Sequence, residues 1–218
     1  MTRIILASGS KVRANLLQAA AIDFEIIRPR VDEEDLKVGL RAQNLSPADR
    51  ALALAEGKCL SVAREEKGFV IGADQVLDFE GKIMSKPDSM ERARRELLDL
   101  SGKTHKLHSA VALARGGETI WSHTELSTLK MRELSPMFIG RYLAAAGEEV
   151  LASVGAYQLE GLGVQLFKSV EGDYFSILGL PLLPLLIVVS AIDLAKLGPQ
   201  TINAGNLTLD LGNSKVAR

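Results

Sequence analysis

The chain has 218 residues, of which 47% are hydrophobic and 24% charged, and its formal net charge is −1. A chain of this length can fold as one domain without a disulfide or metal staple, and its single cysteine, Cys59, excludes an internal disulfide framework and indicates a reducing compartment. The net charge provides no global field for nucleic acid or an anionic membrane, so any phosphate binding must come from a local cluster of cations.

Short apolar runs alternate with stretches of helical periodicity along the chain. Runs bounded by glycine or proline predict strands, and apolar residues that recur every three or four positions after a serine predict helices. We expect strands at 3–7, 24–28, 69–73, 105–114 and 119–131, a hairpin from 164–169 and 174–178, and helices after Ser10, at 46–63, 89–99 and 135–145, and after Pro184. Because strands and helices are interleaved, the sequence predicts an α/β (mixed α-β) fold.

The ends of the chain and one apolar segment bear on its location. The N-terminal apolar run is too short for a signal peptide. Segment 177–192 is interrupted by Gly179, Pro181 and Pro184 and is shorter than the ~20 residues of a membrane span. We therefore expect a soluble, cytoplasmic protein with no membrane contact. Residues 1–198 are predicted to form one domain, and the polar segment 199–218 is predicted to be a mobile tail.

Ser8, Ser10 and Arg13 surround the predicted start of the first helix. A helix N-terminus offers free backbone N–H groups and the positive end of the helix dipole, to which two hydroxyls and a guanidinium add. The spacing is not that of a P-loop. Taken alone, the segment fits either an anion-binding seat or an ordinary capped turn.

Asp74 follows the buried strand predicted at 69–73. The end of such a strand is where ligands of α/β folds commonly bind, and a carboxylate there can hold a divalent metal or accept a proton from water. An aspartate that only forms a turn would give the same pattern. Lys58 and Lys86, taken alone, fit solvated surface positions, and the acidic run 32–35 fits either a solvated loop or a source of a second metal carboxylate.

Taken together and in this order, these features resemble the Maf-like family of nucleotide pyrophosphatases. The resemblance covers roughly residues 4–197. It is carried by Leu6-Ala7-Ser8-Gly9-Ser10 with Arg13, Asp32-Glu33, Lys58, Gly72-Ala73-Asp74, Lys86-Pro87, the run 100–105, Gly155-Ala156-Tyr157, Gly172-Asp173-Tyr174 and Gly179-Leu180-Pro181. It implies an elongated fold with a mixed sheet and two lobes around a central cleft, similar to the inosine triphosphate pyrophosphatases.

The resemblance also implies an activity, the hydrolysis of nucleoside triphosphates to nucleoside monophosphate and pyrophosphate. The matching positions are Asp74 as the catalytic aspartate, Ser8 and Arg13 with Ser10 as phosphate-binding residues, and Lys58 and Lys86 as cleft lysines. A divalent metal, Mg²⁺ or Mn²⁺, is expected at Asp74 with help from Glu33, and homodimers are compatible with the family. Metal, arginine and lysine together would stabilise the charge that develops during attack at the α-phosphorus.

Two cations of the family pattern are absent. The family usually has Pro-Arg-Arg where this chain has Lys11-Val12-Arg13, and a lysine where it has Ser153. Lys11 can replace a charge but not the bidentate geometry of an arginine. We expect these changes to alter substrate affinity more than reaction type.

Gln75 and Glu160 bear on the nucleotide base. Family members that act on thymidine and uridine triphosphates tend to carry Thr and Gln at these positions, so this pair resembles the branch that acts on 7-methyl-GTP. A carboxylate can accept hydrogen bonds from guanine N1–H and N2–H and offsets the positive charge of an N7-methylated ring. The alternative is that Glu160 is an ordinary surface residue.

Other functional classes remain open from the sequence. A nucleotide-binding regulator of septum formation with little turnover would fit the loss of cations at Val12 and Ser153. The retention of Asp74, Lys58 and Lys86 favours an enzyme. A nucleic-acid-binding module is disfavoured because no basic stripe with interleaved aromatic residues is present. A broad phosphatase would release orthophosphate instead of pyrophosphate.

Overall fold

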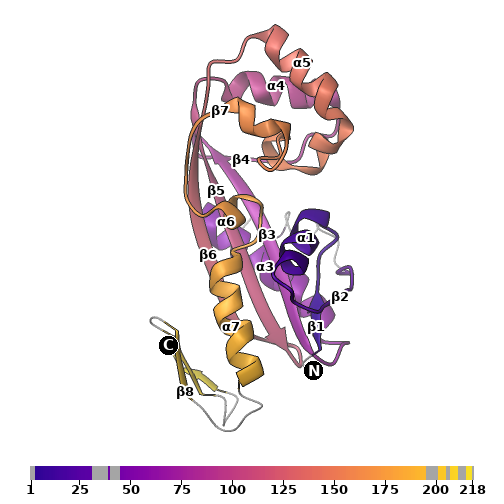
Figure 1. Ribbon diagram of the computed structural model, residues 1–218, viewed down its shortest axis with the longest axis vertical. Helices are drawn as coiled ribbons and strands as arrows, with labels where there is room; N and C mark the ends of the chain where they lie inside the picture. Colours follow the sequence, from indigo (N-terminus) through magenta and orange to yellow (C-terminus); the bar gives the residue numbers. More distant parts are fainter. Residues whose placement is uncertain are drawn as a thin grey trace.

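The protein is an elongated molecule of two lobes joined by three long strands (Figure 1). These strands are β3 (Phe69–Phe79), β5 (Thr104–Arg115) and β6 (Glu118–Met131). The computed structural model describes residues 3–30, 39, 45–194, 201–204, 207–210 and 215–217. The predicted mixed α/β class is confirmed.

One mixed sheet runs through both lobes, in the order β2-β1-β3-β5-β6-β7, with β4 paired to β3. Its remaining strands are β1 (Ile4–Leu6), β2 (Glu25–Ile26), β4 (Lys82–Met84) and β7 (Phe167–Glu171). β1 lies parallel to β2 and β3, and the other pairs are antiparallel. The parallel strands therefore belong to the N-terminal lobe, and antiparallel hairpins extend the sheet into the other lobe.

Serine caps begin the four longest helices of the first 146 residues. Ser10, Ser46, Ser89 and Ser135 each accept a hydrogen bond from the backbone N–H three residues further on. The helices are α1 (Lys11–Ala19), α3 (Pro47–Ala63), α4 (Met90–Leu100), α5 (Pro136–Ala146), α6 (Tyr174–Ile177) and α7 (Leu182–Leu194), with 3-10 turns η1 (Gly147–Ala152), η2 (Val154–Ala156) and η3 (Leu162–Leu166). The helix starts predicted at Ser10 and Ser46 are confirmed.

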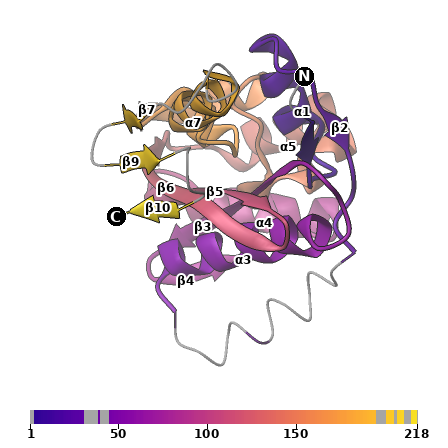
Figure 2. The ribbon, with the colours of Figure 1, turned by 90° about the horizontal axis from the view of Figure 1, so that it is seen from below.

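The sheet of the N-terminal lobe is covered on both faces, with α3 on one side and α1 and α7 on the other (Figure 2). Alternate residues of β3 enter different cores as a result. Val70 and Val76 pack with α3, whereas Ile71 and Ala73 pack with α1 and α7. The continuous apolar run before Asp74 is thus explained by burial on two faces.

The predicted hairpin from 164–169 and 174–178 is wrong, because residues 164–166 belong to η3 and the strand begins only at Phe167. β7 pairs with β6, but the segment after it forms the short helix α6. The Asp173 carboxylate accepts a hydrogen bond from the backbone N–H of Ser176 at 2.7 Å, which caps this helix. The cap outweighs the strand-like composition of the segment.

The apolar segment near the C-terminus forms α7, whose Leu185 and Val189 are buried in the N-terminal lobe. In the described part of the chain, no helix combines the length and apolarity needed to cross a bilayer. The segment predicted to be a mobile tail contains β8 (Thr201–Ala204), β9 (Leu207–Asp210) and β10 (Lys215–Ala217) in a separate antiparallel sheet. Its mobility stays a prediction.

His105 is a buried hydrogen-bonding residue of β5. Only 1% of it is exposed, and its Nε2 is hydrogen bonded to Tyr157 Oη at 2.8 Å. Burial lowers the pKa of His105 from 6.5 to about 4. His105 is thus part of the core of the C-terminal lobe.

We expect acid to destabilise the fold through His105. Between pH 6.5 and about 4 the unfolded chain binds a proton at this residue and the folded chain does not, so the free energy of unfolding falls as pH decreases. The loss attributable to this group reaches about 3 kcal/mol at full effect. Urea unfolding gives the free energy of unfolding of the wild type and of His105→Leu at pH 7, 5.5 and 4.5. The difference between the two proteins should shrink as the pH falls. A difference that does not vary with pH would contradict the prediction.

Candidate functional site

A gap along one edge of β3 creates the site. β1 pairs with residues 69–71 of this strand and β4 with residues 77–79, so among the described residues those at 72–76 pair only with β5. Successive side chains of a strand point to opposite faces, but at an open edge both faces reach the same space. Asp74 and Gln75 accordingly both line one cleft. The predicted strand end before Asp74 is wrong, because β3 continues to Phe79.

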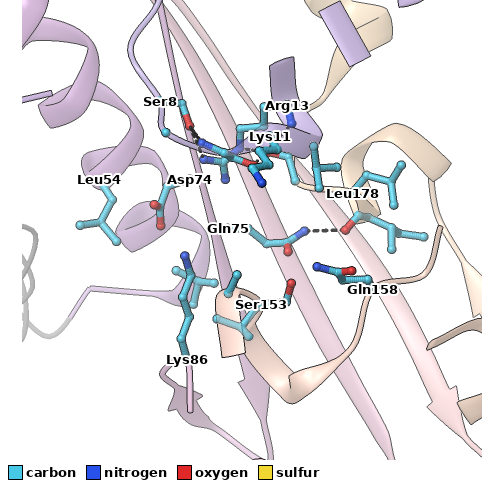
Figure 3. A pocket seen from close by; sticks show the side chains of 18 of the residues that line it. Ser8, Lys11, Arg13, Leu54, Asp74, Gln75, Lys86, Ser153, Gln158 and Leu178 are labelled. Atoms are coloured by element: carbon cyan, nitrogen blue, oxygen red, sulfur yellow. Dashed lines mark hydrogen bonds between the residues drawn. The ribbon is translucent and has the colours of Figure 1, made fainter. Parts of the chain in front are cut away.

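The cleft has a volume of about 870 Å³ and lies between the two lobes. Its walls come from the start of α1, one face of α3, the segment after β4, and the η1–η2 region. Figure 3 shows these side chains converging on Asp74 and Gln75. The lining carries six cationic side chains, Lys11, Arg13, Arg28, Arg50, Lys58 and Lys86, against three carboxylates, Asp74, Glu149 and Glu160. The local cation cluster that phosphate binding requires is therefore present in a chain of net charge −1.

The predicted anion seat lies in this cleft. Ser10 is the N-cap of α1 and accepts a hydrogen bond from the backbone N–H of Arg13 at 3.4 Å. The Ser8 hydroxyl accepts from the backbone N–H of Ser10 at 3.2 Å and from Arg13 Nη1 at 3.3 Å. Arg13 Nε donates to the Gly179 carbonyl at 2.8 Å. These contacts hold the guanidinium at the wall where a helix N-terminus can also receive an anion.

A largely buried ion pair joins Asp74 to α3. Lys58 Nζ lies 2.7 Å from Asp74 Oδ1, and the two side chains are only 7% and 14% exposed. The Asp74 side chain also lines the cleft. Lys86 extends towards the same carboxylate from beyond β4 (Figure 3). The arrangement can orient a water molecule while Lys58 fixes the carboxylate.

Gly72 allows α3 to lie close enough for this ion pair. A Cβ at Gly72 would overlap the Ala55 carbonyl oxygen and would lie 2.7 Å from Cys59 Cβ. Cys59 itself is fully buried, its thiol donates to the Val70 carbonyl at 2.9 Å, and burial raises its pKa to about 12. The thiol is thus a packing group at the helix–sheet contact.

We expect Gly72→Ala to push α3 away from β3. The overlap is with backbone and cannot be relieved by a rotamer change, so the free energy of unfolding should fall by about 2 kcal/mol. Turnover should fall as well, because Lys58 moves with the helix. Gly140→Ala in α5 is the control, since its Cβ would meet nothing closer than 3.7 Å. Urea unfolding measures the stability of both variants. If Gly72→Ala were as stable as Gly140→Ala, the close approach of α3 to β3 would be contradicted.

The residues predicted to read the base also line the cleft. The Gln75 amide nitrogen donates to the Ser109 hydroxyl at 2.8 Å and to the Ser176 and Ile177 carbonyls at 3.0 Å each. Glu160 is exposed and lines the cleft. Its position in the lining is compatible with contact to a base, and that role stays a prediction.

Of the two residues predicted to bind a metal, the structure describes only one. Asp74 lies in the cleft, but Glu33 is outside the described residues. Among the residues that are described, no three His, Cys, Asp or Glu side chains form a metal-binding cluster. Magnesium in nucleotide sites is commonly held by one or two carboxylates together with substrate phosphates. The donor set is consistent with a metal that arrives with a triphosphate.

Two cleft arginines were not predicted. Arg50 precedes Leu54 and Lys58 by four and eight positions on α3, and all three line the cleft. That spacing places residues on one helix face and could have identified Arg50 once Lys58 was chosen. Arg28 follows β2, beside the end of β1, and its Nε lies 3.6 Å from the position of a Cβ on Gly9. Nothing local in the sequence marks Arg28.

Fold and cleft together define a mixed α/β protein with a polyanion-binding site built around one buried carboxylate. The chain belongs to the family of Maf-like proteins, whose family model matches residues 3–192. Both missing family cations, at Val12 and Ser153, fall on the lining of the same cleft.

Two relatives that are named for an enzymatic activity match most of the chain. It is 51% identical over 185 residues to the 7-methyl-GTP pyrophosphatase of Mesorhizobium japonicum, a match covering 84% of this chain and 93% of the relative. It is 49% identical over 186 residues to the nucleoside triphosphate pyrophosphatase of Caulobacter vibrioides, covering 85% and 94%. The solved Ham1 protein of Staphylococcus aureus is similar with a TM-score of 0.39 and 17% identity over 62% of this chain and 72% of that chain. That distant likeness carries no functional argument.

Proposed function

We propose that the chain is a nucleoside triphosphate pyrophosphatase, which hydrolyses the bond between the α- and β-phosphates. The observation that carries the proposal is the buried Asp74–Lys58 pair at 2.7 Å in a cleft with six cations and three carboxylates. The names of the Mesorhizobium and Caulobacter relatives support it. Nothing in the described part of the chain favours the alternative of a regulator with little turnover.

Asp74 is proposed to orient a water molecule and accept its proton. The water oxygen bonds to the α-phosphorus while the bond from that phosphorus to the bridging oxygen breaks, and pyrophosphate leaves. Lys58 holds one oxygen of the carboxylate, and the Asp74 side chain lines the cleft. A site that only binds nucleotide would not require a carboxylate among the cations, because the carboxylate repels the phosphates that the cations attract.

The remaining cations are proposed to hold the triphosphate. Arg13 is pre-oriented by Ser8 and Gly179 and can form two parallel hydrogen bonds to a phosphate. Lys86, Arg28 and Arg50 surround the same space and can stabilise charge on the departing pyrophosphate. Arg28 and Arg50 add positive charge to a cleft that lacks the family cations at Val12 and Ser153.

The proposed cofactor is Mg²⁺ or Mn²⁺, with Asp74 as the ligand from the described residues and Glu33 as a second. When bound, a divalent cation supplies positive charge to the phosphate oxygens and lowers the pKa of bound water. Removal of metal with a chelator is expected to abolish turnover. The homodimer and the cytoplasmic location stay predictions of the sequence.

The proposed substrate class is a guanine-type nucleotide such as 7-methyl-GTP. We expect Glu160→Gln to reorder the preference among methyl-GTP, GTP, UTP and dTTP. An amide offers one donor and one acceptor, which matches uracil or thymine better than guanine. The ratio of kcat/KM for methyl-GTP over UTP should fall about tenfold, as expected for a lost charged hydrogen bond. Glu149→Gln, on the same cleft, is the control, and an unchanged ranking would refute the role of Glu160.

The proposed function is tested by a turnover panel. Purified protein is incubated with normal and methylated nucleoside triphosphates, with Mg²⁺, Mn²⁺ or EDTA, and pyrophosphate and orthophosphate are measured separately. Metal-dependent pyrophosphate release is the expected result. Orthophosphate release would indicate a phosphatase, and tight nucleotide binding without turnover would indicate the regulator.

A further inference from the structure

A row of polar side chains crosses three strands beside the cleft. Gln75 of β3 lies opposite Ser109 of β5, and Ser109 lies opposite Glu125 of β6. Directly opposite residues point to the same face of a sheet, so the three side chains form one line. Ser176 of α6 lies against the row, and both serines are fully buried. Buried polar groups in such a position cost stability unless they are hydrogen bonded.

Hydrogen bonds join the whole row. Gln75 Nε2 donates to Ser109 Oγ and to two backbone carbonyls, those of Ser176 and Ile177. Ser109 Oγ donates its own proton to the Ser176 carbonyl at 2.6 Å. Ser176 Oγ donates to Glu125 Oε2, also at 2.6 Å. The row therefore runs from the cleft to Glu125 of β6.

The contacts leave the Gln75 amide only one orientation. Backbone carbonyls carry no proton, so they must face the amide nitrogen and not the amide oxygen. The proton of the Ser109 hydroxyl is already committed to Ser176, so Ser109 can only accept from Gln75. Figure 3 shows the amide nitrogen directed towards the segment before Leu178 and the amide oxygen directed into the cleft.

We propose that Ser109 is a positioning residue that holds Gln75 as an obligatory hydrogen-bond acceptor for the nucleoside. Glu125, which acts through Ser176, supports the same orientation of Gln75. The site then selects a nucleoside with a hydrogen-bond donor at that point, either an exocyclic amine of the base or a ribose hydroxyl. This inference rests on the proposed function, because it assumes that a nucleotide occupies the cleft.

Selectivity follows from the fixed orientation. A free glutamine can rotate its amide and meet either a donor or an acceptor, so it discriminates little. A fixed acceptor loses its partner when the nucleoside lacks the donor, and a buried group without a partner carries the full desolvation cost. Sites built to bond a particular substrate group reject analogues without it far more strongly than apolar pockets do.

Ser109→Ala tests the inference with two substrate pairs. GTP against ITP removes the base amine, and GTP against dGTP removes the ribose 2′-hydroxyl. In the wild type we expect one pair to differ in kcat/KM by about tenfold, the size of effect expected for one hydrogen bond in a buried site. In Ser109→Ala that ratio should fall, mainly through KM, because the amide loses one of its acceptors and the Ser176 carbonyl loses the hydroxyl that holds it in place. Glu125→Ala should shift the same ratio in the same direction by less.

Ser127→Ala is the matched control. Ser127 of β6 is also a buried serine, 1% exposed, but its hydroxyl has no hydrogen-bond partner among the described residues. Its substitution should leave both ratios unchanged. Because each ratio compares two substrates on the same variant, a general loss of stability cancels from it.

A second measurement does not depend on turnover. The Gln75 side-chain NH₂ group, assigned by its absence in Gln75→Glu, should exchange slowly with water in the wild type and in Ser127→Ala, and faster in Ser109→Ala. If no triphosphate is turned over, the proposed function fails, and the same substrate ratios are measured as dissociation constants. Unchanged ratios in Ser109→Ala, or an amide that exchanges equally fast in all variants, would overturn the inference.

Discussion

Asp74→Asn is expected to lower kcat for pyrophosphate release by about a thousandfold, within the usual range for removal of a general base. Asparagine has the same shape and can still accept a hydrogen bond from Lys58, which lies 2.7 Å from the present carboxylate. It cannot take a proton from water at neutral pH. The folded state should therefore persist while the chemical step is lost, and kcat at saturating substrate measures the difference.

Asp78→Asn is the matched control for this prediction. Asp78 lies on the same strand, but its carboxylate accepts from the backbone N–H of Gly81 in a turn and does not line the cleft. It should retain the wild-type rate. If Asp74→Asn kept more than a tenth of the wild-type kcat, another group would have to activate the water.

Lys58→Met is expected to affect both folding and turnover. It removes the partner of a carboxylate that is only 14% exposed, and breaking a buried ion pair from one side typically costs about 3 kcal/mol of the free energy of unfolding. Turnover should fall about a hundredfold, because Asp74 loses its orientation and the cleft loses a cation near the phosphates.

The double variant Lys58→Met with Asp74→Asn separates the two effects. It leaves no unpaired charge in the pair, so it should be more stable than Lys58→Met alone, although no more active. Urea unfolding of the wild type, both single variants and the double variant gives the coupling between the two side chains. Strictly additive changes in stability would mean that the two groups do not interact in solution.

The parts of the fold that the sequence predicts correctly are marked by local signals. Serine caps and apolar spacing identify α1 and α3, and a continuous apolar run identifies β3 as buried on two faces. The short helix α6 was missed because four residues are too few for a helical period to be visible. Its stability comes from the Asp173 cap, which composition alone does not reveal.

The candidate site was predicted from motifs, but its geometry depends on long-range pairing. Asp74 was expected at a strand end, whereas it lies in mid-strand and reaches the cleft because β1 and β4 leave a gap along β3. The gap follows from which strands pair, and no residue near Asp74 encodes it. Likewise, the alignment of Gln75 with Ser109 follows from strand register, and a serine 34 positions away carries no local sign of its role.

The most direct test of the proposed activity is hydrolysis of 7-methyl-GTP in ¹⁸O-labelled water, with all products separated and quantified. Attack at the α-phosphorus predicts equal amounts of nucleoside monophosphate and pyrophosphate, with the label on the monophosphate, and loss of both products in Asp74→Asn. Nucleoside diphosphate with labelled orthophosphate, or label on the pyrophosphate, would contradict it.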